Sequence, residues 1–502
     1  MDNRKVVLII CDGLGYREEE KHNAVAAAKT PNLDALKKEH PFAILKASGE
    51  AIGLPEGQMG TSEANHLVIG SGRIIYQNLV KINKAIRDGE LKNNPAIIEA
   101  CEHVKAHDSA LHIKGIVSDG GVHGHTDHLK GLVQVAKEHG VEKIFLHLFT
   151  DGRDVAPQSA ERHVLDLEEY LKKEGVGKIA SIGGRYWGMD RDNNHDRVEK
   201  HFFAMTSGSE IKFKNALDVI RHNYEKGITD EFIEPATIEL GEESAGMIAA
   251  NDAVIFANFR SDRAKQITRK MLDTKIDNLK FIAMTKYDDD LDVRVAFEPE
   301  EITDTLSEVI ARNGRKQIKI TETEKFTHLT FFFNAQRYEP EENEERIMIE
   351  SNKDINTHDE KPEMKAKEIT EEIVRAIDKK EHDFIAANIT NCDMVGHSGN
   401  FSAVVKAVEE VDAALGRIIE AAKENDYDLI ITADHGNAEE TFDEKENQPM
   451  TAHTLNPVPF YLVSEKYGKL VRNEGDLSDI APTILKIMNI DIPEKMTGKT
   501  LV

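Results

Sequence analysis

The stretch ITADHGN, residues 431–437, joins an apolar run to two side chains that can bind a metal. Residues 428–432 (DLIIT) are mostly apolar and β-branched, which is typical of a buried strand. Asp434 and His435 follow at the position where strands of open α/β sheets bind ligands. A carboxylate and a neutral imidazole both suit Zn²⁺ and Mn²⁺. On this stretch alone, a helix- or turn-capping Asp434 beside a loop His435 remains the alternative.

The pattern of a short apolar run followed by polar residues repeats along the chain. Between the apolar runs lie helical patterns, over 404–422 and at Ile369, Ile373 and Ile377, with apolar residues every three or four positions. This alternation predicts an α/β fold with largely parallel sheets, and polar clusters follow the strands at their carboxyl ends. We expect strands at 6–10, 43–45, 112–117, 144–149, 179–182, 254–257, 281–284, 384–389 and 429–432.

Composition narrows the class of protein. A length of 502 residues predicts about two or three domains. The net charge of −26 disfavours nucleic acid and anionic membranes as partners, and an anionic substrate would need basic residues gathered in one cleft. No apolar run approaches the ~20 residues of a membrane span, and residues 1–13 do not read as a signal peptide. Three scattered cysteines, Cys11, Cys101 and Cys392, predict a reducing, cytoplasmic compartment.

The domain boundaries are less marked. Residues 81–95 and 297–302 are candidate crossings between domains, and the acidic segment 338–363 is expected to be a solvated excursion. If Asp12 and Asp434 share a metal site, the N-terminal segment rejoins the C-terminal part of the chain.

Six candidate metal ligands follow different predicted strands or loops. Asp393 and His397 lie four residues apart, so a helix would point both side chains the same way. The others are Asp12 in CDGLG, Asp434, His435, and His453 in TAHT. This set is large enough for two ions, and a two-metal site clamps the attacking and leaving oxygens of a phosphoryl transfer.

Ser62 is the candidate nucleophile. It lies in MGTSE, residues 59–63, before an expected helix whose first N–H groups could stabilise a phosphate. A nearby metal would lower the pKa of its hydroxyl. The alternative, that Ser62 is only the helix N-cap, stays open.

Arginines gather after three predicted strands. They are Arg153 (with Asp154), Arg185 and Arg191, and Arg260 and Arg263, and His123 follows the SDGG turn. Arginine binds carboxylate and phosphate groups in a bidentate manner, so in this acidic chain the set predicts an anion cradle. The alternative is pairing with neighbouring acids such as Asp154, Asp192 or Asp262. His125 and His128 are expected at the surface.

Together these stretches resemble the 2,3-bisphosphoglycerate-independent (cofactor-independent) phosphoglycerate mutases, which belong to the alkaline phosphatase superfamily. The resemblance covers nearly the whole chain. The motifs come in the family's order and spacing: CDGLG (11–15), MGTSE (59–63), VSDGGVHGH (117–125), FTDGRD (149–154), GGRYWGMDRD (183–192), NFRSDR (258–263), TEKF (323–326), CDMVGH (392–397), TADHGN (432–437) and TAHTLNPVP (451–459).

The resemblance implies an α/β protein of two domains. Residues 1–76 and 306–502 would form an alkaline-phosphatase-like metal domain, with a mostly parallel sheet and helices on both faces. Residues 77–305 would form an inserted α/β domain that binds phosphoglycerate. The resemblance also implies a monomer.

The resemblance further implies roles for individual residues. Ser62 would be the nucleophile that is phosphorylated during the reaction, and Lys325 would help to neutralise the phosphate. One metal would be held by Asp393, His397 and His453, and the other by Asp12, Ser62, Asp434 and His435. The glycerate would be held by His123, Arg153, Asp154, Arg185 and Arg191, with Arg260 and Arg263 gripping its carboxylate or phosphate.

The implied reaction interconverts 3-phosphoglycerate and 2-phosphoglycerate in glycolysis and gluconeogenesis, without 2,3-bisphosphoglycerate. Two divalent metal ions are expected; mixed Asp and His ligands fit Mn²⁺ best, with Mg²⁺, Co²⁺ and Zn²⁺ as alternatives. Asp154 would act as the base or anchor a substrate hydroxyl. The rival interpretations are a metal phosphomonoesterase or phosphopentomutase of the same superfamily, and a non-catalytic metal- or phosphoglycerate-binding protein.

The chain departs from the family pattern in places. Thr61 stands where asparagine usually precedes the serine, and Ala64 and Asn65 replace Val-Gly. Gly124 replaces a serine and Ser261 a proline, and GRDVAP (152–157) replaces the common GRDTPP. None of these departures removes a candidate ligand. Because Thr61 and Asn65 flank the nucleophile, we expect them to affect the geometry of the phosphoserine.

Overall fold

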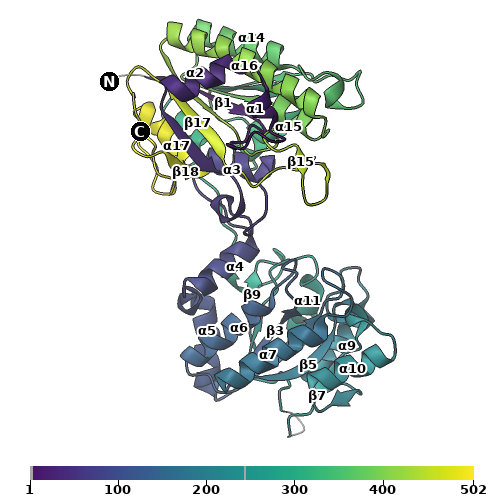
Figure 1. The fold of residues 1–502 in the computed structure, drawn as a ribbon. Helices are drawn as coiled ribbons and strands as arrows, with labels where there is room; N and C mark the ends of the chain where they lie inside the picture. Colours follow the sequence, from purple (N-terminus) through teal and green to yellow (C-terminus); the bar gives the residue numbers. More distant parts are fainter. Residues whose placement is uncertain (1–3, 242–244) are drawn as a thin grey trace. The chain divides into compact units, whose positions relative to one another are not determined.

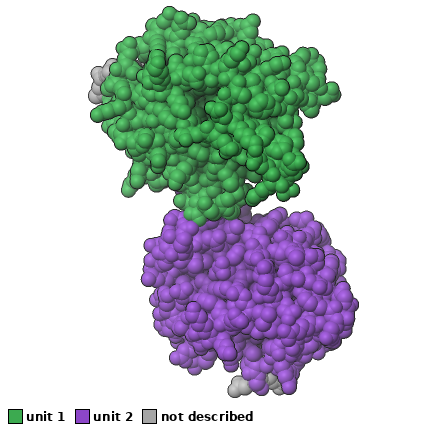
Figure 2. All heavy atoms as spheres, in the orientation of Figure 1, with its two compact units in different colours: residues 1–77, 301–502 green, residues 78–300 purple. Residues whose placement is uncertain are grey.

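The run before Asp434 forms a fully buried strand, β14 (Tyr427–Thr432), in the computed structural model, which describes residues 4–241 and 245–502. The chain divides into two units, residues 1–77 with 301–502 and residues 78–300, shown in different colours in Figure 2. The division of roles between a metal domain and a phosphoglycerate-binding domain remains a prediction.

The first unit is built on an eight-stranded sheet in the order β12-β11-β13-β1-β14-β17-β2-β18 (Figure 1). β1 lies between β13 and β14 and is parallel to both, with Val7 aligned to Ile385 and Leu429. Only β17 runs antiparallel to its neighbours among the described strands of this sheet. The other strand bounds are β1 (Lys5–Cys11), β2 (Phe42–Lys46), β11 (Gln317–Glu322), β12 (Glu344–Ile349), β13 (Phe384–Ile389), β17 (Val458–Val463) and β18 (Glu474–Asp476).

Helices cover this sheet in two groups. α1 (Ala24–Ala27), α2 (Pro31–Glu39), α14 (Ala366–Lys379) and α16 (Phe401–Glu424) pack together on one side, and α3 (Ser62–Ser71), α12 (Leu306–Arg312) and α17 (Ile480–Ile487) form the second group (Figure 1). The predicted apolar face of α16 is confirmed, since Val404, Val411 and Ile418 are fully buried. Two short helices, α13 (Thr323–Thr327) and α15 (Asn391–Gly396), follow β11 and β13 directly.

The second unit has its own eight-stranded sheet, in the order β10-β9-β8-β3-β4-β5-β7-β6. All its pairs are parallel except β5 with β7, among the strands that the structure describes. The strands are β3 (Leu111–Val117), β4 (Ile144–Thr150), β5 (Lys178–Gly184), β6 (Lys212–Phe213), β7 (Ala236–Ile238), β8 (Ala253–Phe256), β9 (Lys280–Thr285) and β10 (Arg294–Phe297).

Two hydrophobic cores line this second sheet. One includes Ile113, Leu146 and residues of α5, α6, α7 and α10; the other includes Phe149, Phe256 and residues of α9 and α11. The helices are α4 (Asn78–Arg87), α5 (Pro95–His107), α6 (Thr126–Glu138), α7 (Ala160–Glu174), α8 (Arg185–Gly188), α9 (His195–Thr206), α10 (Ala216–Glu225) and α11 (Lys265–Asp273).

The predicted α/β class with largely parallel sheets is confirmed, and so are the expected strands. The segment 338–363, expected to be a solvated excursion, contains the edge strand β12, which pairs in parallel with β11 and whose residues are half-buried or exposed. Neither β11 nor β17 was among the expected strands. None of the helices in the described part of the chain combines the length and apolar composition needed to cross a membrane.

Candidate active site

The carboxyl ends of four parallel strands of the first unit bring the candidate residues together. Asp12 follows β1, Asp434 follows β14, Asp393 lies in α15 after β13, and Lys325 lies in α13 after β11. All four side chains are buried. Because β1 lies between β13 and β14, residues from both ends of the chain meet at the carboxyl ends of these central strands.

Gly13 allows the turn after β1 to approach Asp393. Its φ is +78°, a conformation that favours glycine, and a Cβ placed there would lie 2.6 Å from the Cα of Asp393. The Nζ of Lys325 contacts both acids, at 2.7 Å from Asp12 Oδ1 and 2.7 Å from Asp393 Oδ2.

Ser62 is the first residue of α3 and lies beside this cluster. Thr61 is the N-cap, and its side chain accepts a hydrogen bond from the Ala64 N–H at 3.3 Å, so the alternative in which Ser62 caps the helix is wrong. The Ser62 Oγ accepts a hydrogen bond from Lys325 Nζ at 2.6 Å and lies 2.9 Å from His435 Nε2. A buried hydroxyl thus faces a cation and the positive end of a helix.

Charges in the cluster are mutually dependent. Burial would lower the pKa of Lys325, but the carboxylates of Asp12 and Asp393 outweigh it and raise that pKa, so the ammonium stays charged. Burial raises the pKa of Asp12, and the nearby Asp434 raises it further. Burial lowers the pKa of His435 to about 4, so its imidazole is neutral and able to donate a lone pair to a metal.

Two groups of side chains could each hold a metal ion, with ligand atoms within 4.8 Å of one another: Asp393, His435 and His453, and Asp12, His66 and Asp434. The first differs from the set that the resemblance implies, in which His397 accompanies Asp393 and His453. His397 is nevertheless close, since its Nε2 lies 3.2 Å from Asp393 Oδ1 and 3.3 Å from His453 Nε2.

Two observations fit a bound cation. The buried Oδ2 of Asp434 has no hydrogen-bond partner among the described residues, which is costly for an anion unless a cation neutralises it. The Nδ1–H groups of His397 and His453 donate to the carbonyls of Thr451 and Gly60, each at 2.7 Å. These bonds leave both Nε2 atoms directed at Asp393, which is the usual support for a metal-binding histidine.

The structure adds two residues that the sequence did not indicate, His66 and Asn388, and gives contacts for Asn65, which was named from the sequence only as a neighbour of the nucleophile. His66, one turn after Ser62, has its Nδ1 3.5 Å from Asp434 Oδ2. Asn388 in β13 donates to Asp12 Oδ2 at 2.7 Å, and Asn65 donates to the Asp434 carbonyl at 2.6 Å. Asn388 is a polar residue within the buried strand β13, but the contacts of Asn388 and His66 with the site join residues far apart in sequence, so the sequence carries no direct signal for them.

In the second unit, Arg185 is the buried centre of a polar group. It donates to Asp151 Oδ1 at 2.6 Å, pairs with Asp154, and donates through Nη2 to His123 Nε2 at 2.8 Å. Burial and the neighbouring guanidinium lower the pKa of His123 to about 4, so this imidazole is neutral and accepts the bond.

The other predicted arginines lie around the same place. Arg191 and Arg260 share one carboxylate, Asp262, at 3.1 and 3.0 Å. Arg263 donates to the Met189 carbonyl at 3.0 Å. Burial lowers the pKa of Arg263, and the positive charges of Arg185, Arg191 and Arg153 lower it further, which shows that the guanidinium groups are close enough to repel one another.

The alternative interpretation, in which the arginines pair with neighbouring acids, is therefore confirmed in part. Asp154 and Asp262 do bind arginines, as that alternative supposed, and Arg153 lies 3.3 Å from Glu231. His128 is buried rather than exposed, with its Nε2 2.8 Å from Asn83 Oδ1, so the expectation of a surface position for it is wrong.

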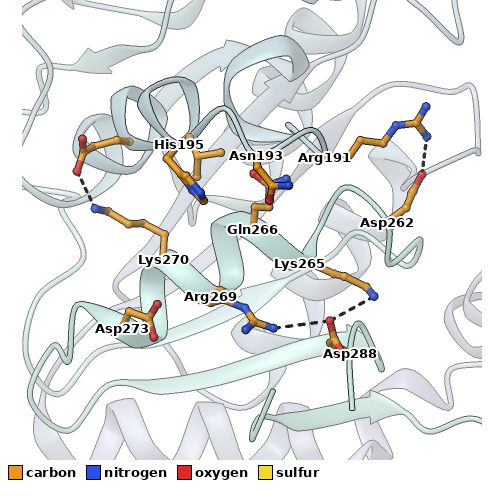
Figure 3. A pocket seen from close by; sticks show the side chains of 12 residues that line it. Arg191, Asn193, His195, Asp262, Lys265, Gln266, Arg269, Lys270, Asp273 and Asp288 are labelled. Atoms are coloured by element: carbon orange, nitrogen blue, oxygen red, sulfur yellow. Dashed lines mark hydrogen bonds and ion pairs between the residues drawn. The ribbon is translucent and has the colours of Figure 1, made fainter. Parts of the chain in front are cut away.

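A hollow of about 500 Å³ lies between α9 and α11, with Arg191 and Asp262 among its lining residues (Figure 3). Its cations are matched by acids: Lys265 and Arg269 both face Asp288, at 3.2 and 3.7 Å. Its lining carries no excess of positive charge.

The sheet of the first unit, with its buried carboxylate, imidazole and serine groups at the strand ends, is of the alkaline-phosphatase-like α/β class, and a second α/β unit interrupts it in sequence. Residues 82–289 match the family model of the BPG-independent PGAM N-terminus, and residues 277–473 match that of type I phosphodiesterase / nucleotide pyrophosphatase. The 2,3-bisphosphoglycerate-independent phosphoglycerate mutases of Clostridium novyi (strain NT) and Clostridioides difficile (strain 630) are 47% and 45% identical to the chain, over 100% of each sequence. The chain belongs to the family of 2,3-bisphosphoglycerate-independent phosphoglycerate mutases.

A solved structure agrees with this assignment. A crystal structure of Leishmania mexicana phosphoglycerate mutase at low cobalt concentration is similar, with 29% identity, a TM-score of 0.54, and coverage of 100% of this chain and 98% of that chain. The predicted family, fold class and enzyme class are confirmed. Enzymes of this family act on a small-molecule substrate, use divalent metals and do not need 2,3-bisphosphoglycerate.

Proposed function

We propose that the chain interconverts 3-phosphoglycerate and 2-phosphoglycerate through a phosphoserine at Ser62, with two divalent metal ions. The observation that carries this proposal is the environment of the Ser62 hydroxyl. It is buried at the start of α3, 2.6 Å from the ammonium of Lys325, which also contacts Asp12 and Asp393. A fixed cation beside a nucleophile stabilises the charge that develops on a phosphoryl group during transfer.

Seven side chains would hold the metals: Asp393, His397 and His453 for one ion, and Asp12, Ser62, Asp434 and His435 for the other. Bound divalent ions lower the pKa of a coordinated hydroxyl and clamp the oxygens of the phosphoryl group. Lys325 donates hydrogen bonds to the phosphoryl oxygens, and the first N–H groups of α3 face the same charge. His435, neutral at physiological pH, keeps a lone pair for coordination.

The arginine cluster would hold the glycerate while the phosphoryl group is on Ser62. Arg185 is fixed by Asp151 and Asp154, so its guanidinium is oriented before substrate binds. His123, Arg153, Arg191, Arg260 and Arg263 complete the set. Asp154 would anchor a hydroxyl of the substrate or take the proton of that hydroxyl. After the glycerate reorients, the other hydroxyl of the glycerate would attack the phosphoserine.

We also propose Mn²⁺ as the physiological metal, a monomeric state and a cytoplasmic location. Mixed carboxylate and imidazole ligands support Mn²⁺ over Mg²⁺, which prefers oxygen ligands and water. Cys11, Cys101 and Cys392 are free and buried, which suits a reducing compartment.

Replacement of the nucleophile tests the proposal. S62A should lower the turnover of 3-phosphoglycerate, with Mn²⁺ present, by roughly 10⁴- to 10⁶-fold, as expected when a nucleophile is removed. S71A is the matched control, since Ser71 is buried in the same helix and bonds only to backbone carbonyls. Wild-type turnover in S62A would contradict the proposal.

The same assay separates the rivals. Formation of 2-phosphoglycerate with little free phosphate supports the mutase, whereas release of phosphate supports a phosphomonoesterase. Turnover of a pentose phosphate instead would support a phosphopentomutase. Bound Mn²⁺ without any phosphoserine after exposure to 3-phosphoglycerate would support a non-catalytic binding protein.

A further inference from the structure

Glu439, four residues after His435, is a buried carboxylate with four hydrogen-bond donors around it. Its Oε2 accepts from the backbone N–H of Gly15 at 3.1 Å and of Asn437 at 2.9 Å. Its Oε1 accepts from the Asn456 side chain at 3.1 Å and from the Thr454 hydroxyl. The side chain is fully buried, and the reaction proposed above does not use it.

The four donors come from three separate loops, and each loop carries candidate metal ligands. Gly15 belongs to the turn after β1 that contains Asp12. Asn437 belongs to the loop after β14 with Asp434 and His435, and its own side chain donates to Asp393 Oδ1 at 3.3 Å. Thr454 and Asn456 lie in the loop before β17, next to His453.

Two glycines let these loops close around the carboxylate. A Cβ on Gly15 would lie 2.2 Å from the Glu439 carboxyl carbon, and a Cβ on Gly436 would lie 2.4 Å from its Oε1. Side chains at these positions would therefore push Glu439 out of place. The close packing indicates that the carboxylate is part of how the loops are assembled.

We infer that Glu439 is a positioning residue that sets the spacing of the three ligand loops and thereby the affinity of the metal site. None of its four partners is itself a candidate ligand, so it acts through the backbone and through Thr454 and Asn456. The inference rests on the proposed function, because it assumes that Asp12, Asp434, His435 and His453 hold metal. Residues that orient metal ligands typically change metal affinity or activity by about 10- to 100-fold when mutated.

A carboxylate suits this position better than an amide. Four donors converge on it, and a carboxylate accepts through both oxygens, whereas a glutamine accepts through one and donates through the other end. The amide nitrogen of a glutamine at this position would face either two backbone N–H groups or the donor of Asn456. E439Q therefore preserves the volume of the side chain but removes part of the attraction between the loops.

The test measures Mn²⁺ binding by isothermal titration calorimetry, and the Tm of the metal-free protein in EDTA. E439Q should bind Mn²⁺ about 10- to 100-fold more weakly than wild type. It should need more Mn²⁺ for half-maximal activity, with a kcat at saturating Mn²⁺ close to that of wild type. A residue with a merely structural role would lower the metal-free Tm and leave the Mn²⁺ affinity unchanged.

D412N is the matched control. Asp412 in α16 is also buried and accepts two backbone N–H bonds, from Asn32 at 3.3 Å and Leu33 at 2.8 Å, but these bonds join α16 to α2, and within the described chain none of its hydrogen bonds goes to a ligand loop. D412N should lower the metal-free Tm without changing Mn²⁺ affinity. T454V removes the hydroxyl that donates to Glu439 and accepts from the Asn456 N–H at 3.2 Å; it serves as a second variant and should also weaken Mn²⁺ binding.

Three outcomes are distinguishable. If wild type binds Mn²⁺ and E439Q binds it within about twofold of wild type, the inference is overturned while the proposed function stands. If E439Q does not fold, the Mn²⁺ affinity of T454V tests the inference instead, and an affinity equal to that of wild type overturns it. If wild type itself binds no Mn²⁺, the proposed function fails first, and the inference fails with it.

Discussion

Two fully buried lysines show how environment decides what a charged residue does. Lys325 is surrounded by Asp12 and Asp393, which keep it charged beside Ser62. Lys114 in β3 instead lies over the ring of Phe256, with its Nζ 4.0 Å from the ring centroid, and it has no hydrogen-bond partner among the described residues. Burial lowers the pKa of Lys114 to about 7. The first lysine serves the site, whereas the second is a cost to stability.

K114M should stabilise the protein at pH 7, by about 1–4 kcal/mol, because it removes an unpaired buried amine and keeps the length of the side chain. The folded-state pKa of about 7 lies below the unfolded value of 10.5. The unfolded state therefore binds more protons between these two values, so the penalty from Lys114 is full below pH 7 and declines as pH rises. The advantage of K114M should shrink between pH 7 and pH 10 in urea unfolding.

K319M is the control for that measurement. Lys319 in β11 is buried too, but its Nζ lies 3.3 Å from Glu344 Oε1, so the same substitution removes one of the two cations beside this buried acid, leaves Arg346 as the other, and should destabilise. A K114M protein that is less stable than wild type at pH 7 would show that the ring contacts of Lys114 outweigh its desolvation.

At the site, residues could be predicted from the sequence where their position after an apolar strand marked them as candidates. Asp12, Asp434 and His435 could be proposed because each directly follows an apolar strand. Asn388 and His66 could not, because their link is a contact between residues 322 positions apart in sequence. Glu439 was missed for the same reason: its sequence neighbours indicate nothing about the three loops that meet on it.

At the scale of elements, the mainly apolar strands β1, β13 and β14 of the first sheet could be predicted, whereas the edge strand β12 and the interior strands β11 and β17 were missed. β1, β13 and β14 are covered on both faces and so appear as short, mainly apolar runs. β12 is an edge strand of mixed exposure with the sequence EERIMI, which reads as polar. β11 is fully buried, but it carries Lys319 and Glu322, whose buried partners are unknown until the fold is complete.

The start of α3 allows a test at this scale. Thr61 caps the helix that begins at Ser62. T61A should cost about 1 kcal/mol of stability, because the capping hydrogen bond is lost, whereas T61N should be close to neutral, since asparagine caps helices at least as well as threonine. Thermal unfolding of the two variants checks this, and equal destabilisation in both would contradict a capping role. Asparagine is also the residue usual in the family at this place.

At the largest scale, the chain forms two units with separate hydrophobic cores. The core of the first unit contains residues of β1, β13 and β14, and the two cores of the second lie on either side of its own sheet. In the described part of the chain, no hydrophobic cluster includes residues of both units. The candidate metal ligands all belong to the first unit, and the arginine cluster belongs to the second.

This division predicts that metal stabilises one unit selectively. A ligand that binds only the folded form adds about 2.7 kcal/mol of stability at 100 times its Kd, and the second unit lacks the seven candidate ligand side chains. Trp187, the single tryptophan of the chain, lies in the second unit, so its fluorescence reports the unfolding of that unit alone. Adding Mn²⁺ to EDTA-treated protein should raise the midpoint of one transition in circular dichroism and leave the fluorescence midpoint unchanged. 3-Phosphoglycerate should instead raise the fluorescence midpoint and leave the Mn²⁺-sensitive transition unchanged, because the arginines that would bind it surround Trp187 in sequence. Equal shifts of both signals with Mn²⁺ would mean that the units unfold together or that metal also binds the second.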